Sequence, residues 1–129
     1  MDARKAVQIL LVEDEARTAK VLARMLREDG FRVEVTSDGA VAIGRLARPP
    51  LPDLLIADVR LPHVDGIAVA RYARSLDPDM PIILTTSWAA QAIAAERDMT
   101  PRPTVFAKPY EYPKLAAEIE RLVFSPRAP

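Results

Sequence analysis

The chain has 129 residues, of which half are hydrophobic and 28% are charged, a composition that predicts one folded domain and excludes a disordered chain. It contains no cysteine, which excludes disulfides and thiolate metal sites, and its 18 basic and 18 acidic residues cancel, which disfavours a general attraction to nucleic acid. No apolar run approaches the ~18 residues of a membrane span, and the N-terminus does not resemble a signal peptide, so we expect a cytoplasmic protein that does not enter a membrane.

Short apolar runs alternate with stretches of helical periodicity. Residues 7–12 form an almost unbroken apolar run, as expected of a parallel strand covered on both faces. Residues 16–29 have helical spacing, and Gly30 is expected to end that helix. The helix has a mainly apolar face (Thr18, Val21, Leu22, Met25, Leu26) opposite a basic stripe (Arg17, Lys20, Arg24, Arg27).

The same alternation continues to the end of the chain. Asp38 is a suitable N-cap for the second helix, and the prolines of residues 48–52 interrupt the helical pattern. Further strands are predicted at 31–35, 54–57, 82–85 and 104–107, and further helices at 39–47, 66–76, 88–97 and from about residue 113. Five such units predict an α/β fold, a doubly wound five-stranded parallel sheet with five helices on its two faces.

Polar residues gather where these strands end. Glu13 and Asp14 follow the first strand, Asp58 the third, Thr86 the fourth and Lys108 the fifth. Because the carboxyl ends of parallel strands share one edge of the sheet, we expect these side chains to converge. Three neighbouring carboxylates repel one another unless a cation joins them, and a hard cation such as Mg²⁺ suits oxygen ligands. The set therefore predicts a carboxylate nucleophile that accepts a phosphoryl group beside a metal and a lysine.

Four motifs make the chain resemble a known family. They are the acidic opening at 10–15 (LLVEDE), the segment 53–66 (DLLIADVRLPHVDG), the strand 81–86 (PIILTT) and the ending 108–110 (KPY). Together they are similar to the CheY-like receiver domain of two-component response regulators, and the likeness covers about residues 6–124. The resemblance implies a flavodoxin-like fold with strand order 2-1-3-4-5.

The resemblance also implies a role for each residue of the set. Asp58 would accept the phosphoryl group, while Thr86 and Lys108 would contact its oxygens. Mg²⁺ would be held by Asp58, by Asp14, by Glu13 through a water molecule, and by the backbone carbonyl of Arg60. The contact of Lys108 would be positioned by a peptide bond to Pro109 that is usually cis in the family.

The implied function is a phosphorelay receiver that catalyses only its own phosphorylation and dephosphorylation and signals by a conformational switch to a protein partner. The donor would be a sensor histidine kinase or a histidine phosphotransfer protein, and the first helix of such domains helps to contact it. The basic stripe on residues 16–29 could serve that contact or could be a solvated face. No direct binding of nucleic acid is expected.

The chain departs from the family pattern on the surface that reports phosphorylation. Val105 stands where an aromatic residue is common, and residues 97–104 carry two prolines in place of a glycine-containing turn. Trp88, the only tryptophan, lies two residues after Thr86 and is expected within reach of the mouth of the site. His63, the only histidine, is not expected to bind metal or phosphate.

Other functions fit the residues less well. A haloacid-dehalogenase-like phosphatase needs a second aspartate at the position of Arg60, and no glycine-rich nucleotide loop is present. A receiver used only for binding would be expected to lack part of the acidic and lysine set. We predict a single receiver domain over 1–129, with 125–129 as a tail or linker stub. Two arrangements stay open: a stand-alone receiver, acting as a switch, phosphate shuttle or sink, and one domain of a longer regulator or hybrid kinase.

Overall fold

The fold is a five-stranded parallel sheet between two pairs of helices. We analysed a computed structural model that describes residues 7–88, 90, 93 and 97–124. The strands are β1 (Gln8–Val12), β2 (Arg32–Thr36), β3 (Leu54–Asp58), β4 (Ile82–Thr86) and β5 (Thr104–Ala107), in the order β2-β1-β3-β4-β5. The predicted fold class and strand order are therefore confirmed.

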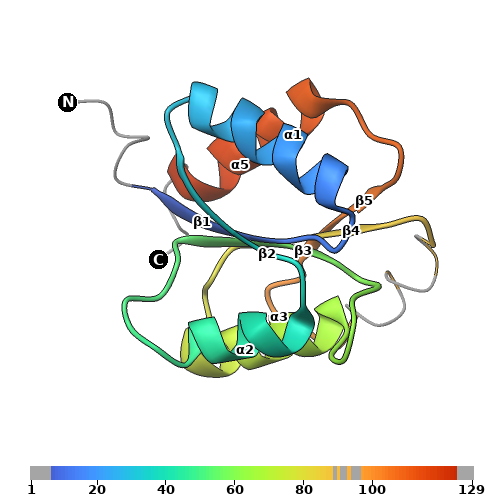
Figure 1. The fold of residues 1–129 in the computed structure, drawn as a ribbon. Helices are drawn as coiled ribbons and strands as arrows, with labels where there is room; N and C mark the ends of the chain where they lie inside the picture. Colours follow the sequence, from blue (N-terminus) through green and yellow to red (C-terminus); the bar gives the residue numbers. More distant parts are fainter. Residues whose placement is uncertain (1–6, 89, 91–92, 94–96, 125–129) are drawn as a thin grey trace.

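Two helices cover each face of the sheet (Figure 1). Helices α1 (Ala16–Glu28) and α5 (Tyr112–Phe124) lie on one face, and α2 (Gly39–Leu46) and α3 (Gly66–Leu76) lie on the other. These are the four helices of the described residues. The fifth predicted helix, at 88–97, falls largely outside the residues that the structure describes. Within those residues no helix is long and apolar enough to span a membrane.

The core consists of two apolar layers, one on each side of the sheet. Successive residues of β1 alternate between them, because neighbouring side chains of a strand point to opposite faces. Ile9 and Leu11 pack in the layer beneath α1 and α5, whereas Leu10 and Val12 pack in the layer beneath α2 and α3. All five residues of β3 and of β4 are buried, which explains why each strand is apolar up to the polar residues at its carboxyl end.

Helix boundaries follow the capping residues of the sequence. The Asp38 carboxylate accepts hydrogen bonds from the Ala40 and Val41 amides, as predicted for an N-cap of α2. The Glu15 side chain caps α1 in the same way. Gly30 follows the end of α1 with φ of 98°, a left-handed conformation that glycine adopts without strain.

The predicted faces of α1 need two corrections. The buried residues are Ala19, Leu22, Ala23 and Leu26, whereas Val21 is 52% exposed. Arg27 does not belong to a purely solvated stripe, because its guanidinium donates to the Val33 carbonyl of β2 at 2.7 Å. The small alanines of α1 therefore face the sheet, and Val21 lines a groove beside Tyr110 and Tyr112.

Candidate functional site

Three carboxylates meet at the carboxyl edge of the sheet. Glu13 and Asp14 follow β1, and Asp58 is the last residue of β3, the strand beside it. One carboxylate oxygen from each lies within 4.8 Å of the others. Glu13 and Asp58 are buried and Asp14 is exposed, so the cluster opens to solvent on the side of Asp14. The predicted convergence of these three residues is confirmed.

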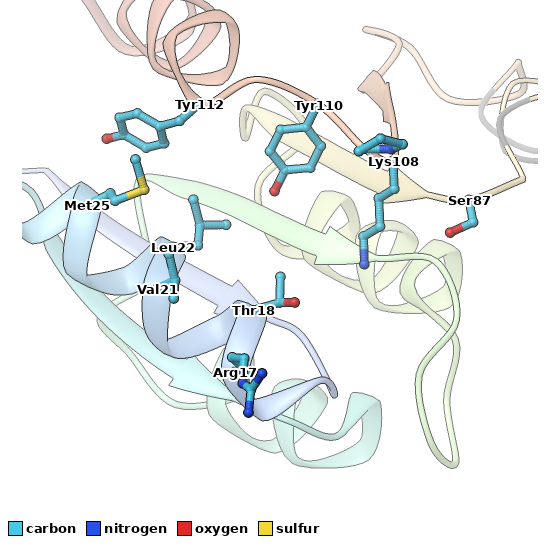
Figure 2. A pocket seen from close by; sticks show the side chains of 10 residues that line it. Arg17, Thr18, Val21, Leu22, Met25, Ser87, Lys108, Tyr110 and Tyr112 are labelled. Carbon is cyan, nitrogen blue, oxygen red and sulfur yellow. The ribbon is translucent and has the colours of Figure 1, made fainter.

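Lys108 bridges the two buried carboxylates. Its ammonium nitrogen lies 2.9 Å from Oε1 of Glu13 and 2.8 Å from Oδ2 of Asp58. The residue follows β5 at the far end of the sheet, and its long side chain extends back to the end of β3 (Figure 2). The Lys108–Pro109 peptide bond is cis, as expected from the resemblance.

Burial and charge act on the protonation of this cluster in opposite directions. Burial raises the pKa of Glu13, and the nearby charge of Asp58 adds to this, while the hydrogen bond from Lys108 opposes it. Burial alone would lower the pKa of Lys108, but its hydrogen bonds to Asp58 and Glu13 raise that pKa above its ordinary value. Lys108 therefore stays charged at neutral pH and balances part of the carboxylate charge.

Thr86 closes the site on the β4 side. It is fully buried, and its Oγ1 accepts a hydrogen bond from the Trp88 amide at 2.9 Å. Its backbone carbonyl accepts from the Lys108 amide at 2.8 Å, which ties the ends of β4 and β5 together. The threonine hydroxyl still has its own hydrogen to donate.

The β3–α3 loop, residues 59–65, forms the opposite wall. Its base is closed by a hydrogen bond from the Gly66 amide to the Val59 carbonyl at 2.8 Å. A Cβ atom on Gly66 would lie 2.0 Å from the carbonyl oxygen of Asp58, so only glycine lets α3 start so close to that backbone. Arg60 lies in this loop with its side chain exposed.

The donor set fits a hard divalent cation. Carboxylate oxygens from three residues are ligands of the kind that Mg²⁺ takes, usually together with several waters. The open side at Asp14 leaves room for those waters and for a phosphoryl group. Among the described residues this is the one cluster of three or more acidic or histidine side chains close enough to share an ion.

A groove of about 540 Å³ runs from the site along α1. Val21 and Met25 of α1 form one side, and Tyr110 and Tyr112 form the other; Lys108 lies towards one end (Figure 2). Burial raises the pKa of Tyr110, so its hydroxyl stays protonated and available as a hydrogen-bond donor. From the predicted basic stripe only Arg17 lines the groove.

The sequence reasoning missed a contact at the tip of the 59–65 loop. His63 Nδ1 lies 2.6 Å from Oδ2 of Asp38, the cap of α2. Asp38 was recognised as a cap and His63 as a loop residue, but they are 25 positions apart and no local signal joins them. The departure at Val105 is accommodated simply: the side chain packs against the core layer beneath α2 and α3.

The fold and the site together define an α/β domain that presents an acidic, lysine-bridged cluster at the carboxyl edge of its sheet. The sequence profile described as the response regulator receiver domain matches residues 9–120. The chain is 35% identical over 118 residues to the response regulator receiver protein CpdR of Brucella abortus, covering 92% of this chain and 98% of that protein. This chain therefore belongs to the receiver domain family of response regulators.

Two further likenesses extend this result. The receiver domain of the sensor histidine kinase PA1611 from Pseudomonas aeruginosa PAO1, solved with a magnesium ion coordinated in its active site cleft, is 31% identical. It superposes with a TM-score of 0.78 over 92% of this chain and 98% of that one. The transcriptional regulatory protein ZraR of Escherichia coli K12 is 29% identical over 89% of this chain, which spans only 26% of that protein.

Proposed function

We propose that Asp58 is the phosphoacceptor of a two-component receiver and that its phosphorylation switches the contacts of the domain with a protein partner. The observation that carries the proposal is the placement of Asp58, buried at a strand end and paired with Lys108 at 2.8 Å beside two further carboxylates. A structural ion pair would need one acid, whereas this cluster has three acids and one ammonium. The excess negative charge supports a site for a cation and a transferring phosphoryl group.

The reaction is a transfer from phosphohistidine to carboxylate. An oxygen of Asp58 forms a bond to phosphorus while the phosphorus–nitrogen bond of the donor breaks, and the leaving imidazole keeps the electron pair and takes up a proton. Lys108 offers its ammonium to the phosphoryl oxygens, and the Thr86 hydroxyl donates to another. Hydrolysis of the resulting acyl phosphate by water regenerates Asp58, so the domain catalyses only reactions of its own side chain.

Asp14 and Asp58 would bind Mg²⁺ directly, Glu13 through a water molecule, and the Arg60 carbonyl would complete the protein's share of the ligands. When bound, the ion supplies positive charge against the oxygens of the transferring group. Burial is the main cause of the raised pKa of Glu13, and the nearby charge of Asp58 adds to it, so a bound cation would favour the ionised carboxylate.

The groove along α1 is proposed to receive the phosphodonor, a sensor histidine kinase or a histidine phosphotransfer protein in the cytoplasm. It leads to Lys108, and the exposed Val21 offers an apolar contact, with Arg17 at the same end of α1 as the site. This places the docking role on the mainly apolar face of α1 and leaves most of the basic stripe to solvent.

Phosphorylation by a small donor tests the assignment. The protein is incubated with acetyl phosphate and Mg²⁺, and the mass of the intact protein is measured. One added phosphoryl group is expected in wild type, none in Asp58→Asn, and none when the metal is chelated. Asp53→Asn, a change at an exposed aspartate at the opposite end of β3, serves as the control and should be labelled like wild type. Labelling of Asp58→Asn to the wild-type extent would refute the proposal.

A further inference from the structure

His63 and Asp38 join two loops that lie side by side at the carboxyl edge of the sheet. Asp38 uses both carboxylate oxygens: Oδ1 caps α2 through the Ala40 amide at 2.7 Å, and Oδ2 lies 2.6 Å from Nδ1 of His63. An ionised carboxylate can only accept, so the His63 ring donates through Nδ1. The same aspartate therefore holds the start of α2 and the tip of the 59–65 loop.

The backbones of the two loops also touch at this point. The Gly39 amide donates to the Pro62 carbonyl at 3.3 Å, and a Cβ atom on Gly39 would lie 1.7 Å from the Val64 carbonyl oxygen. The start of α2 is thus the surface against which the loop tip rests. A shift of one loop must be transmitted to the other, because there is no space between them.

His63 occupies a conformation that is unfavourable for a histidine. Its φ is 67°, in the left-handed region, and the Val64 amide donates back to the Pro62 carbonyl at 2.8 Å, so residues 62–64 form a tight three-residue turn. Glycine or asparagine would adopt this turn with less strain. Strain of this kind persists where the surrounding contacts compensate for it, and the bond to Asp38 is such a contact.

His63, at the centre of the turn, lies three residues after Arg60 in the same loop. Leu61 and Val64 anchor the loop to the core, and the Val59–Gly66 hydrogen bond closes its base. The His63–Asp38 contact is the polar tie at the tip, on the exposed side of the loop. It is the side-chain hydrogen bond by which the described structure connects the loop to α2.

We propose that His63 and Asp38 act as a positioning pair that holds the 59–65 loop against the start of α2 and so keeps the Arg60 carbonyl in place as a metal ligand. The inference rests on the proposed Mg²⁺ site. The pair touches neither metal nor phosphoryl group and acts through the loop backbone. Partners that orient a metal ligand commonly change metal affinity tenfold or more, and we expect about tenfold here.

The test measures the dissociation constant of Mg²⁺ by calorimetry, with melting temperature recorded for each variant. His63→Gly removes the ring but accepts the positive φ, so it separates the contact from the backbone strain. His63→Asn is the rescue variant, because its Nδ2 lies the same number of bonds from the backbone as Nδ1 of histidine, and asparagine tolerates this φ. Asp38→Ser keeps an N-cap for α2 and removes the partner of His63.

We expect His63→Gly and Asp38→Ser each to weaken Mg²⁺ binding about tenfold. The double variant should be no weaker than either single change, and His63→Asn should bind close to wild type. Equal affinity in wild type and His63→Gly, or additive losses in the double variant, would overturn the positioning role while leaving the metal site itself intact. Failure of wild type to bind Mg²⁺ would instead refute the proposed function. If His63→Gly does not fold, Asp38→Asn replaces it, because asparagine can still cap α2 and hydrogen-bond His63. Asp38→Asn should then bind Mg²⁺ more tightly than Asp38→Ser, and equal affinities of these two variants would overturn the positioning role.

Discussion

The guanidinium carbon of Arg60 lies 5.8 Å from the centre of the Trp88 indole ring, so a cation–π contact spans the mouth of the site. Arg60 belongs to the loop after β3, and Trp88 follows β4. The Trp88 amide also donates to the Thr86 hydroxyl oxygen. The side chains of Arg60 and Trp88 therefore link the two walls of the site across its opening. The backbone amide of Trp88 is in turn bound to the threonine that is proposed to contact the phosphoryl group.

This link predicts that Trp88 reports the switch. When the Thr86 hydroxyl turns towards a group on Asp58, its bond to the Trp88 amide is strained, and the exposed indole changes its surroundings. Tryptophan emission should change on adding Mg²⁺ with beryllofluoride, a mimic of the bound phosphoryl group. Asp58→Asn is the control and should show no change. Unaltered emission of wild type at saturating beryllofluoride would contradict the movement.

The same contact predicts that the acyl phosphate lasts longer in wild type than in a variant without the indole ring. Removing the indole in Trp88→Ala opens the mouth to water, and dephosphorylation should accelerate about two- to fivefold, the factor equivalent to an exposed cation–π contact of about 0.5–1 kcal/mol. Trp88→Phe retains a flat ring over Arg60 and should stay near wild type. The measurement is the decay of radiolabelled protein after removal of the donor. Equal half-lives in all three proteins would leave Trp88 without a shielding role.

Lys108→Ala should destabilise the metal-free protein and strengthen its binding of Mg²⁺. Loss of the ammonium leaves the buried Glu13 and Asp58 uncompensated, and we expect a loss of about 2 kcal/mol of unfolding free energy without metal. The affinity for Mg²⁺ should rise about fivefold, because a competing positive charge has gone. Chemical denaturation with and without Mg²⁺ measures both effects. Lys114→Ala, a change at an exposed lysine on α5, is the control and should leave both quantities unchanged. Weaker metal binding by Lys108→Ala would show that Lys108 shapes the metal site.

The groove predicts a difference between protein and small-molecule donors. Val21→Glu places a charge on the apolar wall of the groove and should slow transfer from a histidine phosphotransfer protein or kinase about tenfold or more, the effect of a central contact residue. Labelling by acetyl phosphate, which needs no docking, should be unchanged. Val41→Glu is matched to it, since Val41 is 58% exposed on α2, on the opposite side of the sheet. Equal effects of the two changes on protein-driven transfer would refute docking in the groove.

Glu118 predicts how acid weakens the packing of α5 on the sheet. A hydrogen bond from Arg121 lowers the pKa of Glu118, partial burial opposes this, and a hydrogen bond from Thr104 of β5 lowers it further. The carboxylate therefore stabilises the fold at pH values above its unfolded pKa of about 4.5, and this contribution is lost as the pH falls through its lower folded value. Glu118→Gln should cost about 1 kcal/mol at pH 7.

The difference between wild type and Glu118→Gln should shrink steadily between pH 5 and pH 3, as measured by urea unfolding at each pH. Glu111→Gln, at an exposed position just before the same helix, is the comparison for a general effect of charge. A gap that stays constant across this range would contradict the lowered pKa of Glu118.

Much of the site could be predicted because it depends on strand ends. In a parallel sheet the carboxyl ends of β1, β3, β4 and β5 meet at one edge, so Glu13, Asp58 and Lys108 converge once the strands are recognised. The three central strands were recognisable because both their faces are buried and their sequences are mainly apolar. Boundaries shifted by a residue, as with Asp58 and Thr86, which belong to their strands.

The rest depends on side-chain packing that periodicity does not encode. A helical wheel places Val21 on the apolar face, but the alanines of α1 decide which part of that face meets the sheet. Arg27 has the spacing of a solvated residue, and its bond to the Val33 carbonyl depends on the distance between α1 and β2. The pairing of His63 with Asp38 likewise requires the three-dimensional meeting of two loops.

The close approach of Gly66 to the Asp58 carbonyl has a mechanical consequence. Gly66 contacts that oxygen closely and donates a hydrogen bond to the Val59 carbonyl, so there is no space for the first turn of α3 to move towards β3. A new group on Asp58 cannot be accommodated by compressing this side. We expect the displacement to occur instead on the side of Thr86, which is followed by the exposed Ser87 and Trp88. We therefore expect a group added to Asp58 to act mainly on the side of Thr86 and Trp88, towards the β4–β5 edge of the domain.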